Sequence, residues 1–275
     1  MKIIDAHLHF GKESYFDEIA RAAGHENNAA HLLGQYEKYG ITAGIVMGNE
    51  PLANTKCQYP PKLCYCAGVH GLNLEHPTTK TAVDIHQRCE LLEKHLQRPE
   101  CVGIKLYPGY DSYYIHDAAL TPLYELAAKY EKPVAVHTGL TAMDRALLKY
   151  SHPLVMDEAA ARFPKVQFVM CHFGEPWFTD AAAVIEKNPN VAADLSGMLE
   201  GKIPDFDAFL QEKQFYISRL KGWLEYLSRY DRFLFGTDWP LANLGDYITF
   251  TKTIIPEHAW EKVFFENAER IYRLS

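Results

Sequence analysis

Eight short apolar segments alternate along the chain with longer amphipathic ones, and this alternation constrains the fold more than any other feature. As a set, the apolar segments are rich in β-branched residues and short enough to be buried strands. The predicted strands are Lys2–His9, Thr42–Gly48, Cys64–Leu72, Cys101–Tyr107, Pro133–Thr138, Val166–His172, Asn190–Leu195 and Phe233–Asp238.

The segments between these strands have the spacing of amphipathic helices. In one of them, Leu32, Leu33 and Tyr36 share a helix face, and Gly40 is a typical residue for ending a helix. The predicted helices are Ala29–Tyr39, Thr79–Gln97, Thr121–Tyr130, Met156–Phe163, Thr179–Lys187, Phe206–Tyr230 and Glu257–Leu274, with an additional one over Leu244–Ile254. The segment Asn49–Lys62 contains three prolines and no helical period, and is predicted to be a loop.

Strands that alternate with helices indicate βαβ units and a parallel sheet. Eight such units in 275 residues predict a single-domain (β/α)8 TIM barrel over residues 1–275. A doubly wound sheet is the second possibility, although no G-x-G-x-x-G motif follows the first strand. No Gly/Ser-rich linker marks a second domain.

The composition excludes several classes of partner. A net charge of -7 argues against binding to nucleic acid or to an anionic membrane surface. No run of apolar residues is long enough for a transmembrane helix, and the polar start of the chain does not fit a signal peptide. We therefore expect a cytoplasmic protein with a small-molecule substrate. The six cysteines are too sparse for a disulfide scaffold, and the Cys64-x-Cys66 pair lacks the second pair that a zinc finger requires.

Thirteen histidines are present, and four of them close predicted strands. His7 and His9 end the first strand, while His137 and His172 end the fifth and sixth. Alternate strand residues point to the same face, so His7 and His9 can converge on one ion. Asp238 ends the eighth strand, which neighbours the first in a closed barrel. The pair His7 and His9 alone is equally compatible with a structural role, and His137 or His172 alone is more typical of a structural buried histidine. Their collection at one rim favours a metal site.

The chain resembles the amidohydrolase superfamily, in particular the branch related to aminocarboxymuconate-semialdehyde decarboxylase. The resemblance extends in order over nearly the whole chain. The matching segments are Asp5-Ala6-His7-Leu8-His9, Gly103-Ile104-Lys105-Leu106-Tyr107-Pro108, His137-Thr138-Gly139, Cys171-His172-Phe173-Gly174, Leu195-Ser196-Gly197, Gly236-Thr237-Asp238-Trp239-Pro240 and Glu266-Asn267-Ala268.

The resemblance implies one divalent metal, expected to be Zn²⁺, on His7, His9, His137 and Asp238. This donor set suits zinc, which activates water and polarises carbonyl groups. Asp238 would orient or deprotonate the water and return the proton to the leaving group. His172 would donate a hydrogen bond to the developing oxyanion. A homodimer is a further possibility by analogy with the family.

Lys105 has two interpretations. Superfamily members with two metals carry a carboxylated lysine at this strand end, but a rim cation that binds a substrate carboxylate is the interpretation we favour. Tyr107, Glu175 and Trp177 are weaker candidates for contact with substrate. The remaining nine histidines are interpreted as surface or structural residues: His25, His31, His70, His76, His86, His95, His116, His152 and His258.

Three functions remain open at this point. The first is a metal-dependent hydrolase of a small amide, ester or lactone. The second is a metal-dependent, non-oxidative decarboxylase of a small unsaturated or aromatic carboxylic acid, which uses the same metal ligands. The third, a catalytically silent barrel, is disfavoured because both Asp238 and His172 are present.

Overall fold

The computed structural model describes residues 1–11, 14–75 and 79–274. Eight parallel strands form one sheet in chain order, from β1 to β8. The strands are β1 (Ile3–Leu8), β2 (Ile41–Met47), β3 (Leu63–Val69), β4 (Cys101–Leu106), β5 (Val134–Val136), β6 (Phe168–Met170), β7 (Val191–Asp194) and β8 (Phe233–Leu234). This order confirms the predicted barrel and excludes the doubly wound sheet, in which the strand order reverses.

Backbone hydrogen bonds close the sheet between its first and last strands. Ala6 N donates to Phe235 O at 2.9 Å, and beyond the end of β8 Asp238 N donates to His7 O at 2.8 Å. His9 N then donates to Trp239 O at 2.6 Å. The chain after β8 therefore continues alongside the end of β1, which brings two distant parts of the sequence together.

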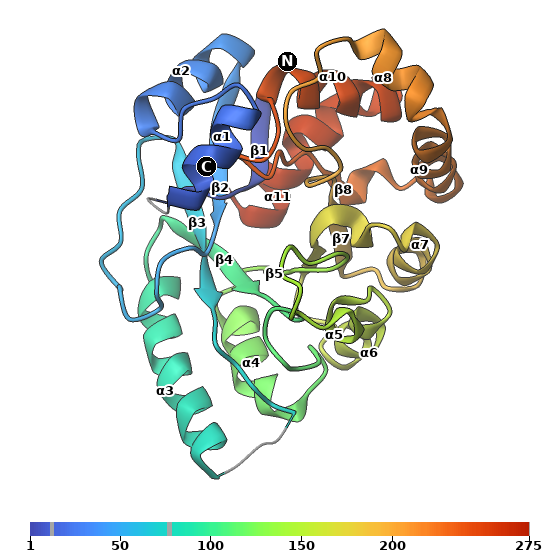
Figure 1. Cartoon of the computed structure of the whole chain (residues 1–275). Helices are drawn as coiled ribbons and strands as arrows, with labels where there is room; N and C mark the ends of the chain where they lie inside the picture. Colours follow the sequence, from blue (N-terminus) through green and yellow to red (C-terminus); the bar gives the residue numbers. More distant parts are fainter. Residues whose placement is uncertain (12–13, 76–78, 275) are drawn as a thin grey trace.

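Helices surround the strands on the outside (Figure 1). Those described are α1 (Ser14–Ala22), α2 (Ala29–Tyr39), α3 (Thr79–Leu96), α4 (Thr121–Lys129), α5 (Leu148–Ser151), α6 (Val155–Arg162), α7 (Phe178–Lys187), α8 (Phe206–Glu212), α9 (Gln214–Leu227), α10 (Leu244–Ile254) and α11 (Asn267–Tyr272). Asn28 caps α2, where its side chain accepts from His31 N at 2.8 Å, and Gly40 ends that helix in the left-handed conformation.

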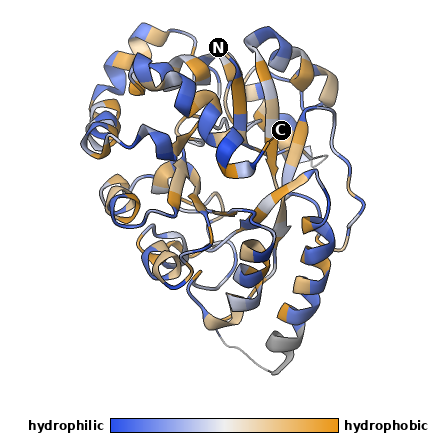
Figure 2. Ribbon diagram, turned by 180° about the vertical axis from the view of Figure 1, so that it is seen from behind, coloured by the Kyte–Doolittle hydropathy of each residue, from blue (hydrophilic) through white to orange (hydrophobic). Residues whose placement is uncertain are grey.

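The interior of the barrel is a separate small cluster of buried side chains. Every strand contributes to it: Ile4, Ala6, Ile45, Met47, Cys66, Val102, Ala135, Val169, Ala192 and Leu234. Many of these residues are small, because the inside of an eight-stranded barrel is narrow. Ala268, Ile271 and Tyr272 from α11 belong to the same cluster. The strands are largely hydrophobic, whereas the helices carry hydrophobic and hydrophilic residues (Figure 2).

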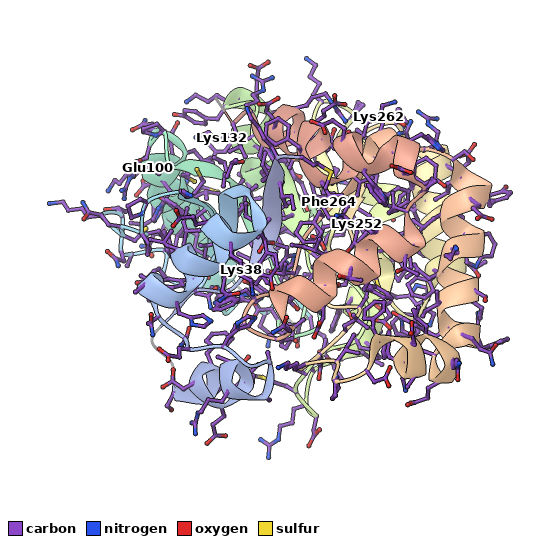
Figure 3. The ribbon with its side chains drawn as sticks, turned by 90° about the horizontal axis from the view of Figure 1, so that it is seen from above. Lys38, Glu100, Lys132, Lys252, Lys262 and Phe264 are labelled. Carbon is purple, nitrogen blue, oxygen red and sulfur yellow. The ribbon has the colours of Figure 1, made fainter. Side chains whose placement is uncertain are left out.

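Charged side chains lie on the outer surface of the helical layer. Lys38, Glu100 and Lys262 are exposed, whereas Phe264 is fully buried (Figure 3). Among the residues that the structure describes, no helix has both the length and the apolar character required to span a membrane.

Several elements differ from the sequence-based prediction. The helix α1 was not predicted, since only Phe16 and Ala20 of its nine residues are buried and the apolar period is short. The predicted helix Phe206–Tyr230 is divided at Lys213, and the predicted helix Glu257–Leu274 contains a π-helical stretch over Lys262–Glu266. The predicted loop Asn49–Lys62 contains no helix.

The strands β6 and β8 end earlier than predicted, and the residues that follow form tight turns. His172 has φ 61° and Asp238 has φ 56°, so both have left-handed backbone conformations that non-glycine residues rarely adopt. A pattern of apolar residues continues through these turns because they are still buried. The alternation therefore placed both residues at the ends of their strands, but it assigned them to the strands themselves rather than to the turns that follow.

A buried carboxyl connects the two ends of the barrel. Asp5 is fully buried and accepts hydrogen bonds from Thr237 N at 2.9 Å, Thr237 Oγ1 at 2.6 Å and Tyr36 OH at 3.3 Å. Burial raises the pKa of the Asp5 carboxyl to about 7, and hydrogen bonds from Thr237, His7 and Tyr36 offset only part of this effect.

We predict that Asp5→Asn removes a loss of stability that the wild type undergoes between about pH 4 and 7. The pKa of Asp5 is higher in the folded than in the unfolded state, so the wild type becomes less stable as the pH rises from about 4 to about 7. Asparagine imitates the protonated carboxyl and cannot ionise. Between about pH 4 and 7, the wild type should lose up to about 1.4 kcal/mol per pH unit relative to the variant, and above pH 7 the difference should stay constant.

The measurement is the free energy of unfolding in urea at about pH 4 to 9, with a chelator present to exclude metal. The exposed Asp207 serves as a matched control, because its replacement by Asn should leave the pH profile unchanged. Parallel profiles for Asp5→Asn and wild type would contradict the prediction.

Candidate metal centre

The ends of β1 and β8 bring three potential metal ligands together. His7 Nε2 lies 3.4 Å from Asp238 Oδ1, and His9 Nε2 lies 3.3 Å from the same oxygen. One ligand atom from each of the three residues lies within 4.8 Å of the others. Three of the four residues predicted to bind the metal are therefore neighbours in space.

Close backbone packing gives Asp238 this position. Gly236 lies directly against β1, and a Cβ atom built on it would be 2.8 Å from His7 Cβ. The left-handed turn at Asp238 follows, with Asp238 N donating to His7 O. The absence of a side chain at residue 236 thus allows the turn to carry the carboxylate to the two imidazoles.

The second nitrogen of each imidazole is held by an oxygen acceptor. His7 Nδ1 lies 2.9 Å from Asp194 Oδ2, and His9 Nδ1 lies 2.9 Å from Asn49 Oδ1. A carboxylate or amide oxygen accepts, so Nδ1 of both rings carries the proton and Nε2 keeps its lone pair. Metal-binding histidines in proteins are typically oriented by such partners.

Two buried atoms at this point, His7 Nε2 and Asp238 Oδ1, have no hydrogen-bond partner among the residues that the structure describes. Burial lowers the pKa of His7 to about 4, an effect that the Asp194 carboxylate reduces. Burial raises the pKa of Asp238, but the neighbouring histidines, His9 first among them, hold it well below its usual range. A neutral imidazole and an ionised carboxylate that face each other unpaired form a donor set that fits a divalent cation.

His172 stands beside this group in the turn after β6. Its ring centre lies 4.8 Å from that of His7 and 5.1 Å from that of His137. His172 Nδ1 is 2.9 Å from Ser196 Oγ and 3.2 Å from Ser196 O. Since the carbonyl oxygen can only accept, Nδ1 carries the proton and the neutral ring has its lone pair on Nε2. Burial lowers the pKa of His172, whereas the carboxylates of Asp238 and Asp194 raise it.

The described residues form two groups of potential metal ligands, one of His7, His9 and Asp238 and one of His7, His172 and Asp194. His137 belongs to neither group. Its Nε2 lies 3.0 Å from Leu140 O and must donate to it, which leaves the lone pair on Nδ1. Burial and the neighbouring His172 lower the pKa of His137 well below its usual range. Metal binding by His137 stays a prediction, and it would have to use Nδ1.

Lys105 is fully buried at the end of β4, not at an open rim as the sequence suggested. Its Nζ donates to Cys171 Sγ at 2.8 Å and lies 5.0 Å from the centre of the Tyr107 ring. In the part of the chain that the structure describes, no carboxylate forms an ion pair with it. Burial raises the pKa of the Cys171 thiol, so the lysine faces a neutral partner.

The weaker candidates occupy different surroundings. Tyr107 OH donates to Met47 O, and its ring stacks on His70 at a centre-to-centre distance of 4.5 Å. Glu175 is half-buried, and burial raises its pKa, although a hydrogen bond from Tyr216 lowers it. The Trp177 ring lies 4.9 Å from that of His152. Contact of these residues with substrate remains a prediction.

Sequence reasoning missed three residues at this end of the barrel. Asp194 ends β7 directly after Val191-Ala192-Ala193, the same signal that identified Asp238. Asn49 follows β2 in the segment that was predicted as a loop. His70 was placed inside the third strand, but β3 ends at Val69, so His70 lies at the rim.

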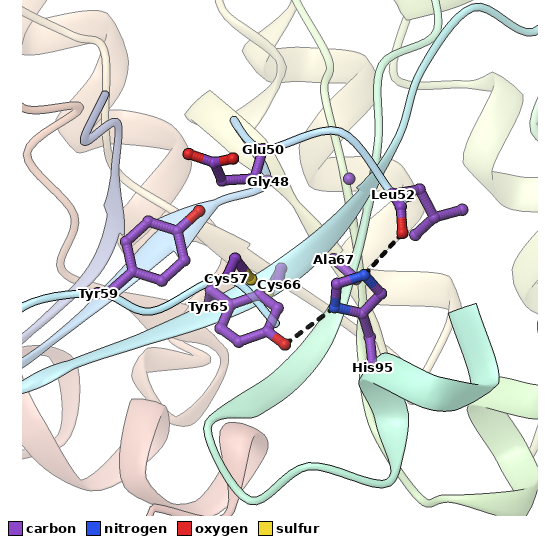
Figure 4. A pocket seen from close by; sticks show the side chains of 10 residues that line it. Gly48, Glu50, Leu52, Cys57, Tyr59, Tyr65, Cys66, Ala67 and His95 are labelled. Atoms are coloured by element: carbon purple, nitrogen blue, oxygen red, sulfur yellow. Dashed lines mark hydrogen bonds between the residues drawn. The ribbon is translucent and has the colours of Figure 1, made fainter. Parts of the chain in front are cut away.

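A small cavity lies elsewhere, beside β3 and the loop after β2 (Figure 4). His95 in its wall uses both ring nitrogens, one toward Tyr65 OH and one toward Leu52 O, each at 2.9 Å. Cys57 and Cys66 also line it, but no cysteine belongs to a potential ligand group in the described residues. Of the nine histidines interpreted as structural, His76 lies outside the described residues.

Comparison with known proteins identifies the family. The sequence model of the amidohydrolase family matches residues 4–274, and the chain therefore belongs to this family. A search of curated proteins finds no match to the chain.

Solved structures with less than 25% sequence identity share the fold. An uncharacterised TIM-barrel protein from Bordetella bronchiseptica has 23% identity and a TM-score of 0.70, with 99% of each chain covered. A probable 2-pyrone-4,6-dicarboxylic acid hydrolase from Acinetobacter baumannii, with citric acid bound, has 17% identity and a TM-score of 0.62, with 100% of each chain covered. The 5-carboxyvanillate decarboxylase from Novosphingobium aromaticivorans, complexed with manganese and a nitrobenzoic acid, has 12% identity and a TM-score of 0.66, with 99% of this chain and 96% of that chain covered.

We predict that Gly197→Ala destabilises the protein through the site. Gly197 has φ +70°, and a Cβ atom there would lie 2.7 Å from His172 Nδ1 and 3.4 Å from Asp238 Oδ2. The left-handed conformation alone should cost about 1–2 kcal/mol. The control is Gly222→Ala in α9, where a Cβ atom would meet nothing within 4 Å. This substitution should stabilise the helix by about 0.5–1 kcal/mol. A Gly197→Ala protein with the wild-type free energy of unfolding would refute this explanation.

Proposed function

We propose that the protein is a metal-dependent hydrolase of a small amide, ester or lactone. The observation that carries this proposal is the pair of buried, unpartnered atoms His7 Nε2 and Asp238 Oδ1, with His9 Nε2 beside them. Leaving such atoms without partners lowers the stability of a fold, and a bound cation would remove this cost. Membership in the amidohydrolase family supports the same function.

We propose one Zn²⁺ as the resident metal, held by His7, His9 and Asp238, with His137 Nδ1 as a further ligand. Imidazole nitrogen with a single carboxylate is a typical donor set for catalytic zinc. When bound, zinc supplies Lewis acidity, which polarises a carbonyl group and lowers the pKa of water. Dimer formation and a cytoplasmic location stay predictions.

Asp238 and His172 are the proposed proton carriers. The ionised Asp238 accepts a hydrogen bond from the attacking water and orients it. His172 in its neutral form offers a lone pair at Nε2, so it must gain a proton before it can donate to a developing oxyanion. This modifies the role inferred from the sequence: we propose that His172 first accepts a proton and then stabilises the oxyanion or protonates the leaving group.

The buried position of Lys105 supports the proposal that the substrate carries a carboxylate. A buried ammonium group without an ionised partner is costly, and a substrate anion would compensate its charge. The same observation favours a second candidate function, the decarboxylation of an aromatic or unsaturated acid. Both 2-pyrone-4,6-dicarboxylic acid and 5-carboxyvanillate, named for two of the similar structures, are carboxylic acids.

We predict that removal of the metal abolishes turnover and that Zn²⁺ restores it. A panel of lactones, esters, amides and aromatic acids provides the assay, with product identification to distinguish hydrolysis from release of carbon dioxide. Asp238→Asn should reduce turnover at least about 100-fold, the usual contribution of a general acid or base. Asp144→Asn, an exposed carboxylate in the loop after β5, is the matched control. Full activity in the chelator-treated protein would contradict the proposal.

A second prediction concerns Lys105→Met. If Lys105 binds a substrate carboxylate, the variant should raise KM about 10-fold or more for anionic substrates, because a hydrogen bond to a charged group contributes about 1.5–3 kcal/mol. Neutral substrates should be unaffected. The control is Lys132→Met, whose amine donates to Leu96 O and Arg98 O at a distance from the site. Equal effects on anionic and neutral substrates, or a carbon dioxide adduct on Lys105 in native mass spectrometry, would contradict this role.

A further inference from the structure

One buried carboxylate, that of Asp194, contacts both halves of the candidate site. Its Oδ2 accepts a hydrogen bond from His7 Nδ1 at 2.9 Å. Its Oδ1 accepts from His172 N at 3.0 Å, Ser196 N at 3.2 Å and Ser196 Oγ at 2.5 Å. Asp194 is fully buried and ends β7, so the rigid sheet holds it in place. Neither the sequence motifs nor the proposed chemistry uses this residue.

The two oxygens of Asp194 act on two different imidazoles. Oδ2 receives the Nδ1 proton of His7, which leaves Nε2 free to face Asp238. Oδ1 receives the hydroxyl proton of Ser196, so Ser196 Oγ is available to accept from His172 Nδ1. The bond from His172 N to Oδ1 also holds the left-handed turn at that residue.

We propose that Asp194 is a positioning residue that sets the tautomer of His7 and orients His172, so that both rings present an Nε2 lone pair. This proposal deepens the proposed function and rests on it where it concerns the metal. The tautomer of His7 is a property of the metal-free protein and is independent of that function. Asp194 itself touches neither substrate nor metal in this scheme.

Asparagine at this position cannot replace the carboxylate, although it has the same shape. An amide has one oxygen, whereas Asp194 faces three donors at Oδ1 and a fourth at Oδ2. If the amide oxygen faces His172 and Ser196, its NH₂ group faces His7 Nδ1, which must then accept and move its own proton to Nε2. If the amide is reversed, its NH₂ group meets the three donors. The first arrangement removes the lone pair that would bind the metal.

The first experiment measures the affinity of the purified protein for Zn²⁺ by competition with a chromogenic chelator. Asp194→Asn should bind Zn²⁺ about 10- to 100-fold more weakly than wild type, the usual effect of removing a partner of a metal-binding histidine. Ser196→Ala is the matched control, because it removes the Oγ bridge to His172 but leaves the Asp194–His7 contact. Its Zn²⁺ affinity should stay close to that of wild type. A folded Asp194→Asn protein with wild-type affinity would overturn the proposal.

The second experiment does not depend on the folding of Asp194→Asn or on metal binding. Nitrogen-15 NMR of histidine-labelled, metal-free wild type reports the tautomer of each ring, and His7→Gln identifies the His7 signals. We expect a protonated Nδ1 and a bare Nε2 on His7, and the opposite tautomer would overturn the proposal. If wild type shows the expected tautomer but binds no Zn²⁺, the proposed function fails while the positioning role of Asp194 stands.

Discussion

The contact between the end of β1 and the chain after β8 is the interaction on which the site depends. Hydrogen bonds from Asp238 N to His7 O and from His9 N to Trp239 O place residues from opposite ends of the sequence within one cluster. Asp5 adds a second connection through Thr237. The residues that close the barrel therefore also assemble the candidate metal ligands.

The architecture could be predicted from the sequence because it follows from repeating patterns. Apolar strands recur eight times, and polar residues that end them gather at one rim of any such barrel. This reasoning located His7, His9 and Asp238 without the structure. It failed where the chain leaves the regular pattern. The left-handed turns at His172 and Asp238 and the position of His70 beyond β3 depend on tertiary packing that periodicity does not record.

Asp194 shows a different limit of sequence reasoning. It has the same signal as Asp238, a carboxylate that ends an apolar strand, but its role depends on which donors face each of its oxygens. Hydrogen-bond direction also changed the interpretation of His172, because a proton on Nδ1 makes the neutral ring an acceptor at Nε2. Residue types and spacing identify the participants, whereas the network of donors and acceptors assigns their chemistry.

The same network explains why the site is organised around unsatisfied atoms. Asp194 and Asn49 accept hydrogen bonds from Nδ1 of His7 and of His9, respectively. In the described part of the chain, the Nε2 atoms that face Asp238 are therefore the ones left for a ligand.

The most direct measurement is a crystal structure of the Zn²⁺-loaded protein with anomalous data at the zinc edge. The account predicts one zinc peak per chain, at about 2.0–2.2 Å from His7 Nε2, His9 Nε2 and an Asp238 oxygen. A zinc peak elsewhere, or none in this cluster, would contradict it.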